Sequence, residues 1–252
     1  MPLYEAKMIH HYDTRWATYE DDGSTRLMTI DEKAQRLHPM PRYWVHEDEI
    51  DKKIEGKADS PWLLGWRRVA RATDERTLIG ALLPEVGAGD SIFLAVLDSA
   101  EAASRSQLVA SWSSLVLDYV TRQKMGGTNL SFFIMEQLAI PGPRMSVKGL
   151  HLPRPWDSWI GAAVDRLNAW SITGERRAAL RAELDALMCH VYGVNRDDVD
   201  YIMETFPIVK RHDDERFGEY RTKRLVLAAY DAMAEAISTR QVYRSPFEEV
   251  AE

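Results

Sequence analysis

Arginines and short polar side chains gather in two stretches of the sequence and could contact a nucleic acid there. The first stretch is WRRVARATDERT, residues 66–77, which holds four arginines and two threonines. Guanidinium groups bind phosphate oxygens and the paired acceptors of guanine in a forked geometry. The alternative is that these arginines form ion pairs with Asp74, Glu75 and nearby acids inside the fold. The sequence favours neither interpretation.

The second stretch is KMGGTN, residues 124–129. A predicted helix ends in Arg122 and Lys124, and two glycines follow, which would let another backbone approach closely. Thr128 and Asn129 then lie near the predicted start of the next helix, where backbone N–H groups favour anions. The alternative is a simple helix cap, although a cap needs one glycine and not the whole cluster.

Other reactive residues have ordinary explanations. Gly87-Ala88-Gly89 lacks the third glycine of a dinucleotide-binding loop and predicts a turn. No Gly-x-Ser-x-Gly or Gly-Lys-Ser/Thr motif occurs. Some residue types in the sequence could bind a metal ion, but their spacing is not that of a metal site. These residues are His10, His11, Asp13, His46, Glu47, Asp51, Glu55 and the lone Cys189. The sequence therefore predicts no catalytic residue, metal ion or cofactor in this chain.

Composition limits the class of protein. The 252 residues are 45% hydrophobic and can bury a sizeable core. One cysteine excludes an internal disulfide framework, and neither a signal sequence nor an apolar run of ~18 residues is present, so we expect a cytoplasmic protein that contacts no membrane. The net charge of −7 argues against coating nucleic acid by bulk charge. Residues 105–154 nevertheless hold six basic and two acidic side chains, whereas residues 13–59 lean acidic.

The pattern of apolar residues predicts an α+β fold. Residues 1–100 contain short apolar runs typical of strands buried on both faces, with short helices at TIDEKAQRL and HEDEIDKKIE. We expect a mixed strand-rich α/β domain over residues 1–140, a Pro-rich linker over 141–157 and a helical domain over 158–252.

Helical periodicity begins near residue 104. Leu108, Trp112, Leu115 and Tyr119 recur at helical spacing and predict one helix over residues 104–124, with a second over 131–138. Further helices are expected over 156–170, 174–192, 196–206 and 220–237. Asn195 is the expected N-cap of the third of these, and Pro207 its end.

Several separated segments resemble one protein family in the same order. They are PLYEAKMIHHYDTRWATY, RYWV, WLLGWRRVARATDERTLIGALLP, LDYVTRQKMGGTNLSFFIMEQLAIP and DDVDYIMETFPIVKR…RFGEYRTKRLVLAAYD. From about Pro2 to Asp231 the chain resembles the C-terminal target-recognition region of the large adenine-specific DNA methyltransferases of type II-G restriction-modification and related phage-defence systems.

The resemblance implies a module that binds double-stranded DNA and positions it for base methylation by a separate methyltransferase domain or subunit. The catalytic part of that family binds S-adenosylmethionine through a Gly-rich loop and carries an Asn-Pro-Pro-aromatic tetrapeptide, and neither motif occurs here. The residues expected to contact DNA are Lys7, Arg15, Arg67, Arg71, Thr73, Arg76, Arg122, Lys124, Thr128 and Asn129.

Two other functions compete with DNA recognition. One is a protein-interaction module that docks on a methyltransferase or nuclease partner without touching DNA, and the acidic charge and the amphipathic stretches at 175–192 and 219–238 favour it. The other is a metal-dependent nuclease that uses Asp51 and Glu55, although these residues lie in a charge run typical of a solvated helix and lack a third ligand.

Overall fold

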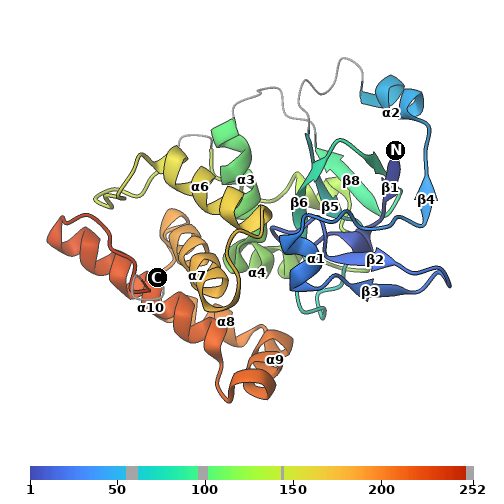
Figure 1. Cartoon of the computed structure of the whole chain (residues 1–252). Coiled ribbons are helices and arrows are strands. Elements are labelled where there is room, and N and C mark those ends of the chain that lie inside the picture. The colour runs from blue at the N-terminus through green and yellow to red at the C-terminus, as the bar shows by residue number, and fades with distance from the viewer. Residues whose placement is uncertain (55–61, 96–101, 143–144, 248–252) are drawn as a thin grey trace.

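The fold is α+β, with small sheets in the first part of the chain and helices in the remainder (Figure 1). A computed structural model describes residues 1–54, 62–95, 102–142 and 145–247. Glu55 of the nuclease hypothesis lies outside these residues. The described strands form two three-stranded sheets and one two-stranded sheet.

The central sheet has β5 (Trp62–Arg67) between β6 (Gly80–Pro84) and β8 (Ile92–Ala95), with antiparallel pairing on both sides. Successive β5 side chains enter different cores: Leu64 and Trp66 join the helices, whereas Leu63 joins a second cluster with residues such as Leu83. Alternate side chains of a strand point to opposite faces, so this sheet is covered on both, as the continuous apolar runs predict.

The N-terminal strands form two smaller sheets. β1 (Pro2–Tyr4) pairs with β4 (Tyr43–Trp44) and, in parallel, with β7 (Gly87–Ala88), and β2 (Ala17–Tyr19) pairs with β3 (Thr25–Leu27). Gly87 and Ala88 therefore lie in a strand, and the predicted turn begins only at Gly89, whose carbonyl accepts from Ile92 N at 2.9 Å. A Cβ on Gly87 would lie 2.7 Å from Val45 Cγ1 and 2.9 Å from Leu3 Cδ1, so a larger residue would have to displace these side chains.

Short helices join these strands. They are η1 (Ala6–Met8), α1 (Ile30–Ala34) and α2 (Glu47–Ile54), and the last two confirm the predicted ones.

The long helix predicted over residues 104–124 is two helices, α3 (Ala102–Ser113) and α4 (Leu115–Lys124). Ser114 has extended backbone angles and its side chain accepts a hydrogen bond from Leu117 N. This N-cap restarts the helix in a new direction. Leu115 N is satisfied by the buried carboxylate of Asp185 at 2.7 Å. The apolar stripe runs through both helices and hides the break.

The C-terminal helices are α6 (Trp156–Asn168), α7 (Gly174–Val191), α8 (Arg196–Glu204), α9 (Pro207–Phe217) and α10 (Arg221–Thr239). Asn195 caps α8 by accepting from Asp198 N at 2.9 Å, as predicted. Pro207 follows the end of α8 but also begins α9, which the periodicity did not predict. Proline suits the first turn of a helix, because a backbone N–H at that position would have no acceptor within the helix.

One hydrophobic core crosses the predicted linker. Tyr12, Leu64 and Trp66 from the first part pack in the same cluster as Leu184 of α7 and Val226 of α10. β6 approaches α3 so closely that a Cβ on Gly80 would lie 2.6 Å from Trp112 Cε3. The described residues of 141–155 form no helix or strand, yet the two parts that they join share buried side chains.

Candidate nucleic-acid interface

The two polar stretches chosen from the sequence lie side by side in the fold. Residues 68–70 extend β5 and pair antiparallel with residues 128–130, with Val69 opposite Asn129. Leu130 N donates to Arg68 O at 2.7 Å and Ala70 N donates to Thr128 O at 3.3 Å. We call residues 68–71 and 128–130 the paired segments.

The polar side chains at this place reach solvent. Arg71, Thr73, Lys124, Thr128 and Asn129 are all exposed. Arg71 begins a tight turn, in which its N–H donates to Asp74 Oδ2 at 2.9 Å and its carbonyl accepts from Asp74 N. Among the described residues, neither Arg71 nor Lys124 forms an ion pair. Both cations are thus available to an external anion.

Gly126 and Gly127 have no internal reason to be glycine. Neither has a positive φ, and a Cβ on either would have no heavy atom within 4 Å. The fold would accept larger residues at both positions. The expectation that these glycines admit a close approach therefore concerns something outside the chain, next to Lys124 and Thr128.

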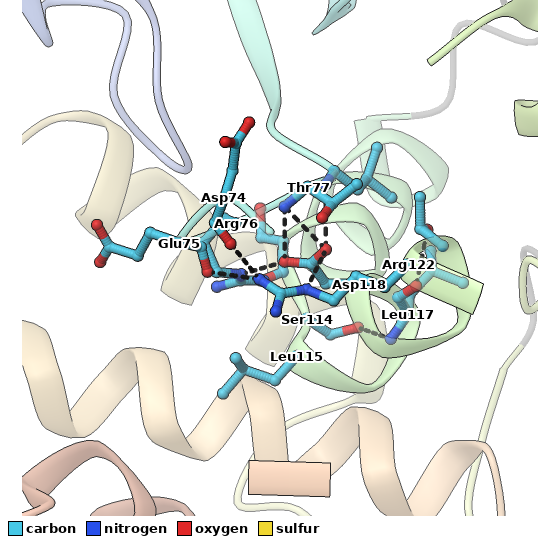
Figure 2. Close-up of polar contacts among 12 residues, drawn as sticks. Asp74, Glu75, Arg76, Thr77, Ser114, Leu115, Leu117, Asp118 and Arg122 are labelled. Carbon is cyan, nitrogen blue, oxygen red and sulfur yellow. Dashed lines mark hydrogen bonds and ion pairs between the residues drawn. The ribbon is translucent and has the colours of Figure 1, made fainter. Parts of the chain in front are cut away.

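A buried carboxylate on α4, that of Asp118, holds residues 76–78 (Figure 2), which end the loop that begins with Arg71 and Thr73. Asp118 has no exposed surface and accepts from Arg76 Nε at 2.5 Å, from Thr77 N at 3.0 Å and from Leu78 N at 3.1 Å. Arg76 also donates to Ser113 O at 2.7 Å. Together these bonds fix the loop against both α3 and α4.

Arg122, one helical turn after Asp118, closes the same loop from the other side. Its guanidinium donates to the carbonyls of Asp74 and Glu75 at 2.7 and 2.8 Å and to Thr205 O at 3.2 Å (Figure 2). It lies 4.1 Å from the centroid of the Phe206 ring. Burial lowers the pKa of Arg122. Arg122 therefore joins the loop to α4 and to the end of α8.

The expectation that Arg76 and Arg122 contact DNA is wrong for this structure. Their side chains are 5% and 8% exposed, and the hydrogen bonds that they donate go to groups inside the fold. For Arg76 the ion-pair alternative holds, although its partner is Asp118 and not one of the neighbouring acids. The signal in the sequence was Asp118 itself, a carboxylate within an apolar helical stripe and four residues before Arg122.

Arg67 and Arg15 are also largely committed to the chain. Arg67 donates through Nε and Nη2 to Ile9 O, and burial lowers its pKa to about 10. It lines an open pocket of about 260 Å³ together with residues such as His10 and Trp16. Arg15 donates to Lys33 O at 2.9 Å and is half-buried. These two arginines are less exposed than Arg71, and part of their donors is used inside the chain.

Lys7 is exposed and is linked to the paired segments by a short path. Its neighbour Ala6 donates to Ser91 Oγ at 2.9 Å, and Ser91 O accepts from Arg68 N at 2.9 Å. Of the ten residues expected to contact DNA, the exposed ones are thus Lys7, Arg71, Thr73, Lys124, Thr128 and Asn129.

Of the histidines considered as metal ligands, His46 is exposed, whereas His10 and His11 lie in a cationic interior. Burial, followed by the charge of Arg67 for His10 and of Arg76 for His11, holds both pKa values well below the usual 6.5. Asp13 forms a buried ion pair with Lys33 at 2.7 Å. Within the described residues, no three His, Cys, Asp or Glu side chains converge on a point that could hold a metal ion.

The sequence did not predict that apolar side chains next to the paired segments are exposed. Val69 is 57% exposed, Phe132 47% and Phe133 73%. Phe132 and Phe133 belong to α5 (Phe132–Met135), which is shorter than the helix predicted over 131–138. Residues 66–77 and 124–133 thus present aromatic, aliphatic and cationic groups together.

Comparisons with known proteins identify no relative. No family model matches the chain, and neither a curated protein nor a solved structure is significantly similar to it. In residues 1–54, 62–95, 102–142 and 145–247, none of the helices combines the length and apolar character needed to cross a bilayer.

Proposed function

We propose that this chain is a DNA target-recognition module, which binds duplex DNA and positions it for adenine methylation by a separate catalytic domain or subunit. The observation that carries the proposal is the pairing of residues 68–70 with 128–130, which brings together the two polar stretches chosen independently from the sequence. The resemblance of the sequence to methyltransferase recognition regions supports a methyltransferase catalytic domain or subunit as the partner.

The exposed groups suit the chemistry of a duplex. Arg71 and Lys124 can contact phosphates and set the register, while Thr128 and Asn129 can donate to and accept from base edges. An enzyme that modifies a base must take it out of the stack, so another module has to grip the flanking duplex. The buried Asp118 network supplies rigidity by fixing the loop on which Arg71 stands.

A gel shift at low salt with duplex DNA tests the proposal. The double variant Arg71→Ala/Lys124→Ala should weaken binding, and the slope of log K against log salt should become shallower by about 0.9 for each phosphate that the variant no longer neutralises. The matched control is Arg166→Ala/Lys53→Ala, which removes the same charge from exposed positions on α6 and α2. Equal weakening in the two double variants would mean that net charge alone explains the loss of binding and that Arg71 and Lys124 are not specific contacts. The proposal would be overturned if the wild-type protein did not retard the duplex.

A specific observation favours the second candidate, a module that docks on a methyltransferase or nuclease partner. Six large apolar side chains within residues 27–44 are 46–66% exposed: Leu27, Ile30, Leu37, Met40, Tyr43 and Trp44. The helices α7 and α10, whose amphipathic stretches first suggested docking, instead bury residues such as Leu184 and Val226 in the shared core.

The two candidates predict different effects of substitution. Leu27→Asp/Trp44→Asp should weaken a complex with the methyltransferase partner, measured by analytical ultracentrifugation, while it leaves binding to duplex DNA unchanged. A partner complex that tolerates both substitutions would remove these apolar residues from the docking surface.

A further inference from the structure

Phe133 has the largest exposed fraction, 73%, among the large hydrophobic side chains of the described residues. It lies four residues after Asn129, and an extended chain of that length spans at most about 14 Å. Phe133 is therefore close to the paired segments. Val69, which pairs with Asn129, is exposed at the same place in the fold, and so is Phe132. An apolar group of this kind marks an interaction site more strongly than a single exposed side chain does.

The base of Phe133 is fixed to the central sheet. The ring of the preceding Phe132 stacks on Phe93 at 4.5 Å and meets the edge of Trp66 at 5.0 Å. Trp66 Nε1 in turn donates to Leu130 O at 2.9 Å. Two residues after Phe133, Met135 is buried in the main core. A side chain on such a support can push against another molecule without the helix giving way.

The groups around this aromatic pair favour a polyanion as the partner. Lys124 and Arg71 are exposed and form no ion pair among the described residues, and Thr128 and Asn129 offer donors and acceptors. Asp90, three residues before Phe93, is paired with Arg68 at 2.5 Å, and the Arg68 guanidinium lies 5.7 Å from the Phe93 ring centroid. Exposed cations in the stretches that also carry an exposed phenyl ring suit a ligand with a phosphate backbone and stacked bases.

We propose that Phe133 inserts between two base pairs of the bound duplex and unstacks them. DNA-bending proteins use apolar side chains as wedges in this way, and the cost of a few kcal/mol per unstacked step is recovered through a larger contact surface. This inference rests on the proposed DNA-recognition function. It adds that the duplex is deformed by the recognition module itself, before any catalytic domain acts.

Permanganate, which oxidises thymines that have lost their stacking, tests the wedge. The full chain is bound to a pool of mixed-sequence duplexes, so that A·T pairs occupy every position, and retarded complexes are treated and mapped. Wild-type protein should make thymines at one step hyper-reactive. Phe133→Ala should abolish this reactivity and weaken binding roughly tenfold, about 1.4 kcal/mol, whereas Phe133→Trp should retain both. Tyr201→Ala, which removes a 61% exposed aromatic from α8, is the matched control and should change neither.

The outcomes separate the wedge from the recognition function. Retarded duplex without reactive thymines would overturn the wedge and leave DNA recognition standing. Absence of retardation would overturn both. If Phe133→Ala weakens only the complex with a methyltransferase partner, Phe133 contacts protein and the wedge proposal fails.

Discussion

Replacing Asp118 by asparagine should strongly destabilise the protein. Asparagine keeps the shape of the side chain but removes its charge and turns one acceptor oxygen into an NH2 donor. Arg76 Nε, now 2.5 Å from a carboxylate oxygen, would face either a neutral acceptor or another donor while 5% exposed. Thr77 N and Leu78 N, both bonded to Oδ1, could keep that oxygen as their acceptor.

The expected destabilisation follows from the buried charge left on Arg76. Removing one partner of a buried ion pair costs about 3–5 kcal/mol. Single domains are stable by about 5–15 kcal/mol, so this cost is a large share of the free energy of unfolding. Urea unfolding followed by tryptophan fluorescence should show a lower midpoint and an unchanged m-value. Lys124→Ala, an exposed change on the same helix, should stay within about 0.5 kcal/mol of wild type.

A second substitution separates the ion pair from other effects. Arg76→Met/Asp118→Asn removes both charges and keeps the acceptor for the two backbone N–H groups, so it should be more stable than Asp118→Asn alone. Recovery should be partial, because Arg122 Nε, 3.8 Å from Asp118, still loses a neighbouring charge. An Asp118→Asn protein within about 1 kcal/mol of wild type, well below the range for a broken buried pair, would refute the reasoning.

Three further substitutions or treatments have defined outcomes. Burial, followed by the charges of Arg76 and His10, holds the pKa of His11 well below 6.5, so the unfolded chain binds the proton more tightly; stability is complete above about pH 6.5 and is lost as pH falls from there toward the folded pKa. His11→Gln should reduce this dependence by up to about 1.4 kcal/mol per pH unit in urea titrations, and equal slopes would contradict the assignment. Burial raises the pKa of the Cys189 thiol, which is 3% exposed, so Ellman's reagent should label it only in denaturant, and rapid labelling of native protein would contradict its burial. Gly126→Ala/Gly127→Ala should change the free energy of unfolding by less than about 0.5 kcal/mol yet weaken duplex binding; a clear drop in melting temperature would show an internal role for these glycines.

The sequence predicted those parts of the fold that depend on local patterns. The apolar runs within residues 1–100 form strands such as β5, β6 and β8, and Asn195 caps α8 as predicted, because apolar runs and capping residues act within a few positions. The helix α9 was not predicted, because none of its residues is buried and no apolar stripe marks it. It is marked only by Pro207 at its start and by Gly218, with φ of 71°, at its end.

The candidate interface was predictable only in outline. Both polar stretches are exposed in part, but their pairing joins residues about sixty positions apart, which local periodicity does not report. The same limit explains the error at Arg76. Its partner, Asp118, is 42 residues away, and the sequence alone does not indicate which acid meets which guanidinium.

The described hydrogen bonds that join residues 68–70 to 128–130 run from main-chain N–H to main-chain carbonyl. The outward side chains of Val69, Thr128 and Asn129 can therefore be exchanged without removing what holds the two segments together. A surface built in this way is open to rapid diversification, because one nucleotide change in the gene alters what the protein presents while its scaffold stays intact.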